Sequence, residues 1–253
     1  MVLKRRLKLY LFIVFGISYF SWIIAIIISN INSDSGFILP LHLIGGASPL
    51  IATIVYLIKT KGWNDYFNRL KNIKETTLVS WLITFSPVII LVISSIIVFG
   101  KVEINPEFPS TLILYSVGLL FFGPLPEELG WRGILFNDLN ELSFKKAQIY
   151  MAVIWFVWHL PLFFIIGTYQ NDLGIVSIDF LFFAINIFIQ SFILGYLFSV
   201  GKKNIILPIL FHYFVNLFGE LLLDNIFYEI LTIILYSIVL LFIYILSKRK
   251  QFS

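Results

Sequence analysis

Residues 77–99 read TLVSWLITFSPVIILVISSIIVF, a run without a single charged side chain. At a helical rise of about 1.5 Å per residue, about 20 apolar residues cross the hydrocarbon core of a bilayer. Similar apolar runs recur along the chain, near residues 8–29, 38–58, 111–126 (with an apolar continuation to 136), 147–167, 177–199, 204–223 and 226–247. The sequence therefore predicts an all-α bundle of about eight transmembrane helices.

The composition supports this fold class and excludes others. Of the 253 residues, 59% are hydrophobic and only 13% are charged, and the mean hydropathy is +0.95. A soluble domain of this length cannot bury so much apolar surface. The apolar residues form long blocks rather than alternating strands, which favours helices over a membrane barrel. Because the basic residues fall between these blocks, the net charge of +4 does not indicate nucleic-acid binding. The absence of cysteine excludes disulfides and thiolate chemistry.

The distribution of positive charge predicts the topology. With a cytoplasmic N-terminus, eight spans also return the C-terminus to the cytoplasm. Every Lys and Arg except Lys101 then lies in an inner segment, namely 1–8, 59–76, 127–146, 200–203 or 248–253, as the positive-inside rule requires. Within the second of these segments, residues 61–77 have the pattern of an amphipathic interfacial helix. We expect one membrane-embedded domain, 1–253, and retention of the first span, because no small-residue cleavage site follows it.

A small set of polar residues interrupts the apolar runs. The stretch PLPEELGWRG, 124–133, places Glu127 and Glu128 side by side between apolar segments, and His159 and His212 lie within predicted spans. Ionisable groups at membrane depth usually face the bundle interior or a wet cavity. We therefore expect these four side chains to meet inside the bundle. His42, near the outer end of the second span, is interpreted as a packing residue.

Helical spacing suggests different roles for the two glutamates. Arg132 follows Glu128 by four residues, and a Glu-before-Arg pair at that spacing favours an ion pair. Glu127 points elsewhere, because successive residues on a helix are about 100° apart. These expectations assume that the helix continues through this stretch, just after a kink expected at Pro124 and Pro126.

The same spacing pairs each histidine with a neighbour. Trp155 lies one turn before His159, where an aromatic ring can orient the imidazole and exclude water. Asn216 lies one turn after His212 on the same helical face. By the predicted boundaries these groups lie in the cytoplasmic half of the membrane, where one cavity open to the cytoplasm could reach them.

A carboxylate, two imidazoles and a carboxamide suit hydrolysis by water. A desolvated glutamate can act as a general base toward water, a histidine can position that water or donate a proton, and an asparagine with a second histidine can donate hydrogen bonds to a developing oxyanion. Glu127, His159 and His212 could alternatively bind one Zn²⁺, although the His-Glu-x-x-His signature is absent. The spacing leaves both possibilities open, so the expected cofactor is either none or one Zn²⁺.

Three motifs in order carry a family resemblance. GPLPEELGWRGILF at 123–136, WFVWH at 155–159 and HYFVN at 212–216 resemble the Glu-Glu-x-x-x-Arg, aromatic-before-His and His-x-x-x-Asn motifs of the CPBP family. This family, also called Abi, includes CAAX proteases and bacteriocin-processing enzymes. GGASPLIATI at 45–54 resembles, more loosely, an early Gly/Pro segment of the family. The resemblance covers roughly residues 40–220, with its motif core at 111–220.

The resemblance implies an intramembrane endopeptidase of the type II CAAX prenyl protease kind, of glutamate or metallo type. Its catalytic residues would be Glu127 as the base, His159 beside it, and His212 with Asn216 at the oxyanion. Supporting residues would be Glu128, Arg132, Trp155 and Phe156. The expected partners are membrane lipids and a peptide or protein substrate, lipidated or otherwise hydrophobic, and no nucleic acid. The expected location is a prokaryotic cytoplasmic membrane, as a multi-pass protein.

Two alternative functions were weighed against the peptidase. The first is a non-catalytic bacteriocin-immunity or regulatory protein on the same fold. The complete set of polar motif residues argues against it, since a protein without catalysis could lose any of them. The second is an ion- or proton-coupled transporter, which would predict inverted repeats. No such repeat is visible in the sequence.

Overall fold

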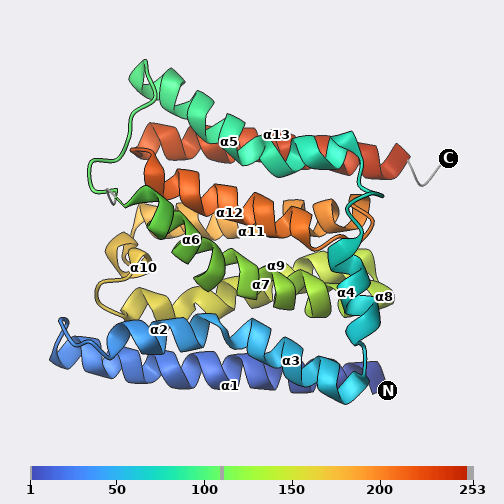
Figure 1. Cartoon of the computed structure of the whole chain (residues 1–253). Helices are drawn as coiled ribbons and strands as arrows, with labels where there is room; N and C mark the ends of the chain where they lie inside the picture. The colour runs from blue at the N-terminus through green and yellow to red at the C-terminus, as the bar shows by residue number, and fades with distance from the viewer. Residues whose placement is uncertain (1, 109–110, 250–253) are drawn as a thin grey trace. The chain divides into compact units, whose positions relative to one another are not determined.

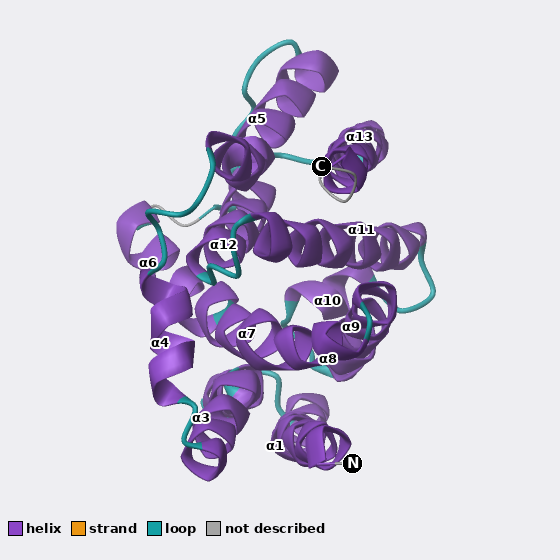
Figure 2. Ribbon diagram, turned by 90° about the vertical axis from the view of Figure 1, so that its right-hand side faces the viewer, coloured by secondary structure: helices purple, strands orange, loops and turns teal. Residues whose placement is uncertain are grey.

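The structure is a computed structural model that describes residues 2–108 and 111–249 (Figure 1). The described part consists of helices and loops (Figure 2), with one isolated β-bridge between Ile104 and Leu222. The chain forms two compact units, each built from two separate segments. Unit 1 comprises Met1–Trp63 and Leu129–Phe188, and unit 2 comprises Asn64–Glu128 and Ile189–Ser253. Residues 250–253, part of the predicted cytoplasmic C-terminus, lie outside the described residues.

The predicted spans correspond to helices in the structure. Among the described residues, six helical segments are long and apolar enough to cross a membrane: Arg5–Ile31, Leu78–Phe99, Leu112–Glu141, Phe144–Phe164, Ile178–Val200 and Ile226–Ser247. The pair Ile38–Gly46 and Ser48–Thr60, bent by 44°, counts as a seventh if it forms one span, and Ile206–Leu221 is apolar but shorter. The prediction of an all-α membrane protein with about eight spans is confirmed. The cytoplasmic location of both termini stays a prediction.

Unit 1 begins with three helices held together at glycine and proline positions. Helix α1 (Val2–Ile31) packs against α2 (Ile38–Gly46) and α3 (Ser48–Thr60). Pro49 lies in the first turn of α3, where its missing N–H costs nothing. At Gly45 of α2, a Cβ atom would lie 2.2 Å from Nε1 of Trp22. The early Gly/Pro segment is therefore a packing element, because only glycine lets the Trp22 indole approach α2 so closely.

The remainder of unit 1 contains the segment after the paired glutamates. It comprises the end of α7 (Pro124–Gly130), the π-helix η1 (Trp131–Phe136), α8 (Asn137–Leu142), α9 (Phe144–His159), the 3₁₀-helix η2 (Leu160–Phe164), α10 (Tyr169–Leu173) and α11 (Ile178–Val200) as far as Phe188. All six residues of η1 are buried. At Gly130, a Cβ atom would lie 2.5 Å from Oη of Tyr10 and 2.6 Å from Cβ of Pro49. Gly130 therefore lets the start of η1 pack directly against α1 and α3.

Unit 2 is built around α12. Helix α12 (Ile206–Leu221) packs against α5 (Leu78–Phe99) and α6 (Leu112–Phe122), and α13 (Ile226–Arg249) packs against α5. Helix α5 begins at a capping box in which Thr77 and Ser80 each accept from the other's backbone N–H. The predicted interfacial segment forms the amphipathic helix α4 (Trp63–Lys71), in which Arg69 and Asp65 form an ion pair of 3.6 Å.

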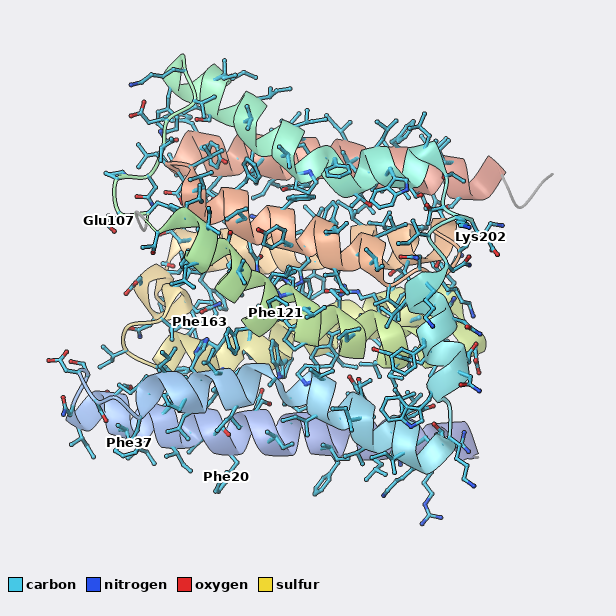
Figure 3. The ribbon with its side chains drawn as sticks, viewed as in Figure 1. Phe20, Phe37, Glu107, Phe121, Phe163 and Lys202 are labelled. Atoms are coloured by element: carbon cyan, nitrogen blue, oxygen red, sulfur yellow. The ribbon has the colours of Figure 1, made fainter. Side chains whose placement is uncertain are left out.

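The loops of unit 2 gather at its two ends as the predicted topology requires. At one end, the backbone N–H of Ile205, two residues after the predicted inner segment 200–203, donates at 3.4 Å to the carbonyl of Arg69 in the predicted inner segment 59–76. At the other, the N–H of Asn105 donates to the carbonyl of Leu221 at 2.9 Å. Figure 3 shows Lys202 and Glu107 at these opposite ends. The basic predicted inner loops therefore share one end of the unit.

Large apolar side chains cover much of the molecular surface. Phe20 of α1 is 70% exposed, and Figure 3 shows its ring pointing away from the helix. Many exposed Ile, Leu and Phe side chains on α1, α5 and α13 are arranged similarly. Large apolar side chains exposed in such number are typical of helices that contact lipid.

Candidate active site

The paired glutamates lie in a short helix that begins just after a break in the backbone. Helix α6 ends at Phe122, and Gly123 has φ −122° and ψ −97°, outside the helical region. The residue before a proline is disfavoured in the helical conformation, whereas a proline is tolerated at the first helical position. Pro124 therefore starts α7, and the N–H of Glu127 donates to the carbonyl of Gly123 at 3.2 Å. The kink predicted just before the glutamates is confirmed.

Glu128 and His212 form a buried carboxylate–imidazole pair in unit 2. Oε1 of Glu128 lies 3.0 Å from Nδ1 of His212. Their side chains are 0% and 5% exposed. An ionised carboxylate has no hydrogen to donate, so Nδ1 of His212 is the donor in this bond. The bond orients the imidazole and leaves Nε2 as its second polar atom.

The second polar atom of His212 can serve as a donor when the imidazole is protonated. The imidazolium carries an N–H at Nε2 as well as at Nδ1. The pair can therefore present a charge-compensated hydrogen-bond donor toward a developing oxyanion.

Asn216 lies one turn beyond His212 on α12 and is half-buried. A Cβ atom at Gly123 would lie 3.9 Å from Nδ2 of Asn216, which is ordinary van der Waals contact. The Asn216 carboxamide is thus beside the break between α6 and α7. Glu127, also buried, follows this break by one helical turn. Unit 2 therefore carries three of the four predicted catalytic groups, namely Glu127, His212 and Asn216.

In unit 1, Arg132 lies against the ring of Trp155. Its guanidinium carbon is 4.9 Å from the Trp155 ring centroid, within the range of a cation–π interaction. Arg132 is the one charged residue of η1, and it is fully buried despite its charge. The aromatic face of Trp155 therefore contributes to the stabilisation of this buried charge.

His159 is oriented by the same residue. Its Nδ1 lies 2.7 Å from the carbonyl oxygen of Trp155, and a carbonyl oxygen can only accept a hydrogen bond. Nδ1 therefore carries the proton, and in the neutral imidazole Nε2 is left with a lone pair. This tautomer can accept a hydrogen bond from water or coordinate a metal ion through Nε2. Trp155 consequently contacts Arg132 with its ring and His159 with both its ring and its backbone.

The sequence His-Leu-Pro ends α9 at His159. Pro161 has no N–H and cannot continue the α-helical pattern, and the chain continues as η2. The carbonyl of Val157, close to this helix end, accepts a hydrogen bond of 2.7 Å from Oη of Tyr19 on α1. This contact joins the end of α9 to α1, so His159 occupies a fixed helix terminus rather than a mobile loop.

Other aromatic residues around His159 were not anticipated from the sequence. The ring centroids of Trp158 and Phe183 lie 4.9 and 5.7 Å from that of His159. Phe156, expected to support the site, packs against Phe180 and Phe188 of α11 at 6.0 and 5.9 Å. The ring of Trp155 lies 5.5 Å from that of His159. The signal for Phe183 would have been its position three residues after Phe180, which places both on one helical face.

Two expectations about the glutamate segment need revision. The helix continues past the glutamates, but from Trp131 it is a π-helix with i→i+5 hydrogen bonding, so the assumed α-helical spacing ends at Gly130. In addition, Glu128 is hydrogen-bonded to His212 of α12, a partner that spacing along one helix does not predict. Glu127, Glu128, His212 and Asn216 belong to unit 2, and Arg132, Trp155, Phe156 and His159 belong to unit 1. The meeting of Glu127 with His159 and the Glu128–Arg132 ion pair stay predictions.

Both histidines have the nitrogen arrangement that metal ligands commonly show. Nδ1 of each is hydrogen-bonded, to a carboxylate or to a backbone carbonyl, which leaves Nε2 for coordination. His159 and His212 therefore fit a zinc ligand set chemically, as they fit a metal-free one. Within each unit, the residues that the structure describes contain no group of three His, Asp or Glu side chains placed to bind a metal ion.

Comparison with known proteins identifies the family. Residues 109–218 match the family model described as type II CAAX prenyl endopeptidase Rce1-like. A curated protein named CAAX prenyl protease 2, from Methanococcus maripaludis, is 31% identical over 237 residues, which cover 87% of this chain and 86% of the relative. The chain belongs to the CPBP family. The matched region of this CPBP member contains all the predicted catalytic and supporting residues, from Glu127 to Asn216.

Family membership and the helical structure together establish the general class of protein. This CPBP member is an integral, multi-pass membrane protein, since its family consists of membrane proteases and it has six or more apolar helices of spanning length. It is a CAAX prenyl protease-like peptidase by family, and a protease family implies a peptide or protein substrate.

Proposed function

We propose that this chain is an endopeptidase that hydrolyses membrane-associated peptides or proteins in a cavity open to the cytoplasm. The observation that carries the proposal is the buried Glu128–His212 hydrogen bond of 3.0 Å. A buried carboxylate that orients a histidine is costly to maintain without a use for the second imidazole nitrogen. Membership of the CPBP family supports peptide hydrolysis as that use.

In the proposed mechanism, Glu127 activates the attacking water. Its carboxylate accepts a proton as the water oxygen bonds to the scissile carbonyl carbon. Nε2 of His159, which has a lone pair in the tautomer deduced above, accepts a hydrogen bond from the other O–H of that water and so orients it. When the C–N bond breaks, Glu127 returns its proton to the leaving amine nitrogen. The products are a carboxylic acid and an amine, and the enzyme regains its starting state.

His212 and Asn216 would stabilise the negative charge that develops on the carbonyl oxygen. Nε2–H of the imidazolium and Nδ2–H of the carboxamide are the proposed donors. Removing one donor from an oxyanion site typically costs about 2.7–4 kcal/mol of transition-state stabilisation. Glu128 acts through His212 as a positioning residue, because its carboxylate is hydrogen-bonded to Nδ1 and holds the imidazole in place.

The proposed substrate class is a C-terminal peptide that carries a prenyl group. The curated relative is named a CAAX prenyl protease, and the exposed apolar helices of this chain provide a surface for a lipidated substrate in the bilayer. A hydrophobic peptide without a lipid, such as a bacteriocin leader or a signalling peptide, is the alternative within the same activity. Matched peptides with and without the prenyl group distinguish the two.

Hydrolysis of these peptides by purified protein in liposomes tests the proposal. Glu127→Gln keeps the size of the side chain and removes the base, so we expect binding without turnover. Glu107→Gln, in an exposed loop, is the matched control and should retain wild-type turnover. Normal turnover by Glu127→Gln would contradict the mechanism. If correctly folded wild-type protein cleaved no peptide of either class, the chain would be a non-catalytic relative.

A chelator titration combined with elemental analysis tests the metal-free form of the mechanism. We expect full activity at less than one zinc ion per chain. Loss of activity with chelator, restored by Zn²⁺ alone, would instead assign Nε2 of His159 and His212 to metal coordination. In that case zinc would polarise the scissile carbonyl and activate the water.

A further inference from the structure

A pocket lies between α1 and α3 of unit 1, outside the candidate active site. The two helices run in opposite directions, so the start of α1 and the end of α3 meet. There the pocket is lined by Arg6 and Lys59, and its walls are apolar, formed by Leu9, Ile13 and Val55. Its cavity volume is about 40 Å³, and it is open to the outside on one side. This combination of two cations and an aliphatic wall suits an amphiphile with a negatively charged head.

The charge around this pocket is strongly positive. Arg6 and Lys59 are exposed, and Arg5, Lys8 and Lys61 are at the same ends of the two helices. Neither α1 nor α3 contains an acidic residue. The nearby negative charge is the carboxylate of Asp138 on α8, and Tyr56, which donates a hydrogen bond to it, also interacts with Arg6. An anionic group at the mouth of the pocket would therefore meet cations that α1 and α3 themselves do not neutralise.

We propose that this pocket binds one anionic phospholipid of the surrounding bilayer. The phosphate contacts Arg6 and Lys59, and the upper part of an acyl chain lies along Leu9, Ile13 and Val55. The long aliphatic stems of Arg and Lys extend toward the headgroup while their charges face the phosphate. The position fits a bilayer lipid, because the pocket opens where two predicted spans end in a basic inner segment.

The inner wall of the pocket connects it to the segment that carries Arg132. Tyr10 and Tyr56, both lining residues, have ring centroids 6.4 Å apart. Tyr10 contacts Trp131 at the start of η1, also at 6.4 Å, and Tyr56 is hydrogen-bonded to Asp138 of α8. A lipid in the pocket therefore contacts Tyr10 and Tyr56, which hold the two ends of the segment from Trp131 to Asp138 in place. Its binding should stabilise unit 1 as well as fill the pocket.

Lipid retention after purification tests the site directly. The protein is reconstituted in phosphatidylcholine with or without phosphatidylglycerol, extracted in mild detergent and analysed by native mass spectrometry. We expect wild-type protein to retain one phosphatidylglycerol and to show a higher midpoint of thermal unfolding in its presence. Each cation near an anionic headgroup contributes about fivefold to affinity, so Arg6→Gln/Lys59→Gln should retain the lipid roughly 25-fold less. Arg5→Gln/Lys61→Gln, with the same charge change outside the pocket, is the control and should retain it.

A second variant leaves the cations in place. Ile13→Trp fills the apolar wall and should also reduce retention, whereas Ile23→Trp, at an exposed position of α1, should not. If Arg6→Gln/Lys59→Gln fails to fold, these two variants still test the lipid site. Equal retention of phosphatidylcholine and phosphatidylglycerol by wild-type protein would overturn the proposal. Equal losses of phosphatidylglycerol retention in the pocket variants and in their controls would also overturn it.

Discussion

Removing the Glu128 carboxylate should weaken both the fold and the oxyanion site through one partner, His212. Glu128 is fully buried and His212 nearly so, so solvent does not screen their 3.0 Å contact. A hydrogen bond to a charged group contributes about 1.5–3 kcal/mol, and leaving a buried charge without its partner costs about 3–5 kcal/mol. We expect Glu128→Ala to lower the free energy of unfolding by the larger amount. Glu128→Gln, which keeps a hydrogen-bond acceptor, should cost less.

The same contact predicts a specific pattern of activity losses. If Glu128 acts by holding His212, loss of either residue removes one oxyanion donor, about 10²–10³ in kcat. A variant lacking both should then be no worse than His212→Gln alone, because residues that act as a unit are strongly non-additive. Peptide hydrolysis in liposomes gives kcat for the four proteins of this cycle, and SDS titration gives their stabilities. The expected coupling in stability is about 1.5–3 kcal/mol.

A second pair in the same unit provides the control cycle. Lys101 and Glu103 form an ion pair of 2.8 Å, but their side chains are 71% and 30% exposed. Such a pair contributes about 0–1 kcal/mol. Additive kcat losses at Glu128 and His212, or wild-type activity in Glu128→Gln, would refute the assigned role of Glu128. A coupling no larger than that of the control pair would refute the energetic reasoning.

Substitutions at Gly130, Trp155 and Tyr19 test the packing of unit 1 around the site, and two further variants serve as controls. Gly130→Ala should destabilise by about 1–3 kcal/mol, because the new methyl group would lie 2.7 Å from a backbone carbonyl oxygen of α3. Gly118→Ala, in open space within α6, should be neutral or stabilising in the same thermal unfolding assay. Trp155→Ala should cost about 3–5 kcal/mol, while Trp155→Phe keeps an aromatic face and should retain most of the stability. Tyr19→Phe removes the 2.7 Å bond to Val157 and should cost about 0.5–1.5 kcal/mol, with a lower kcat at unchanged KM if it displaces the end of α9.

The sequence was most informative where hydrophobicity decides the structure. Apolar runs such as 77–99 correspond to helices within a few residues, because a chain in lipid must satisfy its backbone hydrogen bonds internally. The interfacial helix α4 was predicted by the same reasoning applied to its two faces. The break before Pro124 followed from a local steric rule that needs no tertiary information.

Sequence reasoning was weaker where distant segments meet. The π-helix at Trp131–Phe136 changes the helical phase, so angles counted from Glu127 no longer apply beyond Gly130. The partner of Glu128, on α12, is 84 positions away, and spacing within one helix cannot reveal it. Motif order identified the family and the residue types at the site. Which carboxylate contacts which imidazole depends on how α7 approaches α12, and only the structure supplies that.

The double use of Trp155 has a consequence for mutational scanning. The atom that fixes the His159 tautomer is a main-chain oxygen, which every amino acid at position 155 supplies. A library of side-chain replacements there would register only the loss of the indole and of its contacts with Arg132 and with the ring of His159. The proton at Nδ1 of His159 would persist throughout such a library. Backbone ester substitution, which weakens the carbonyl as an acceptor while keeping the ring, would reveal the second contribution separately.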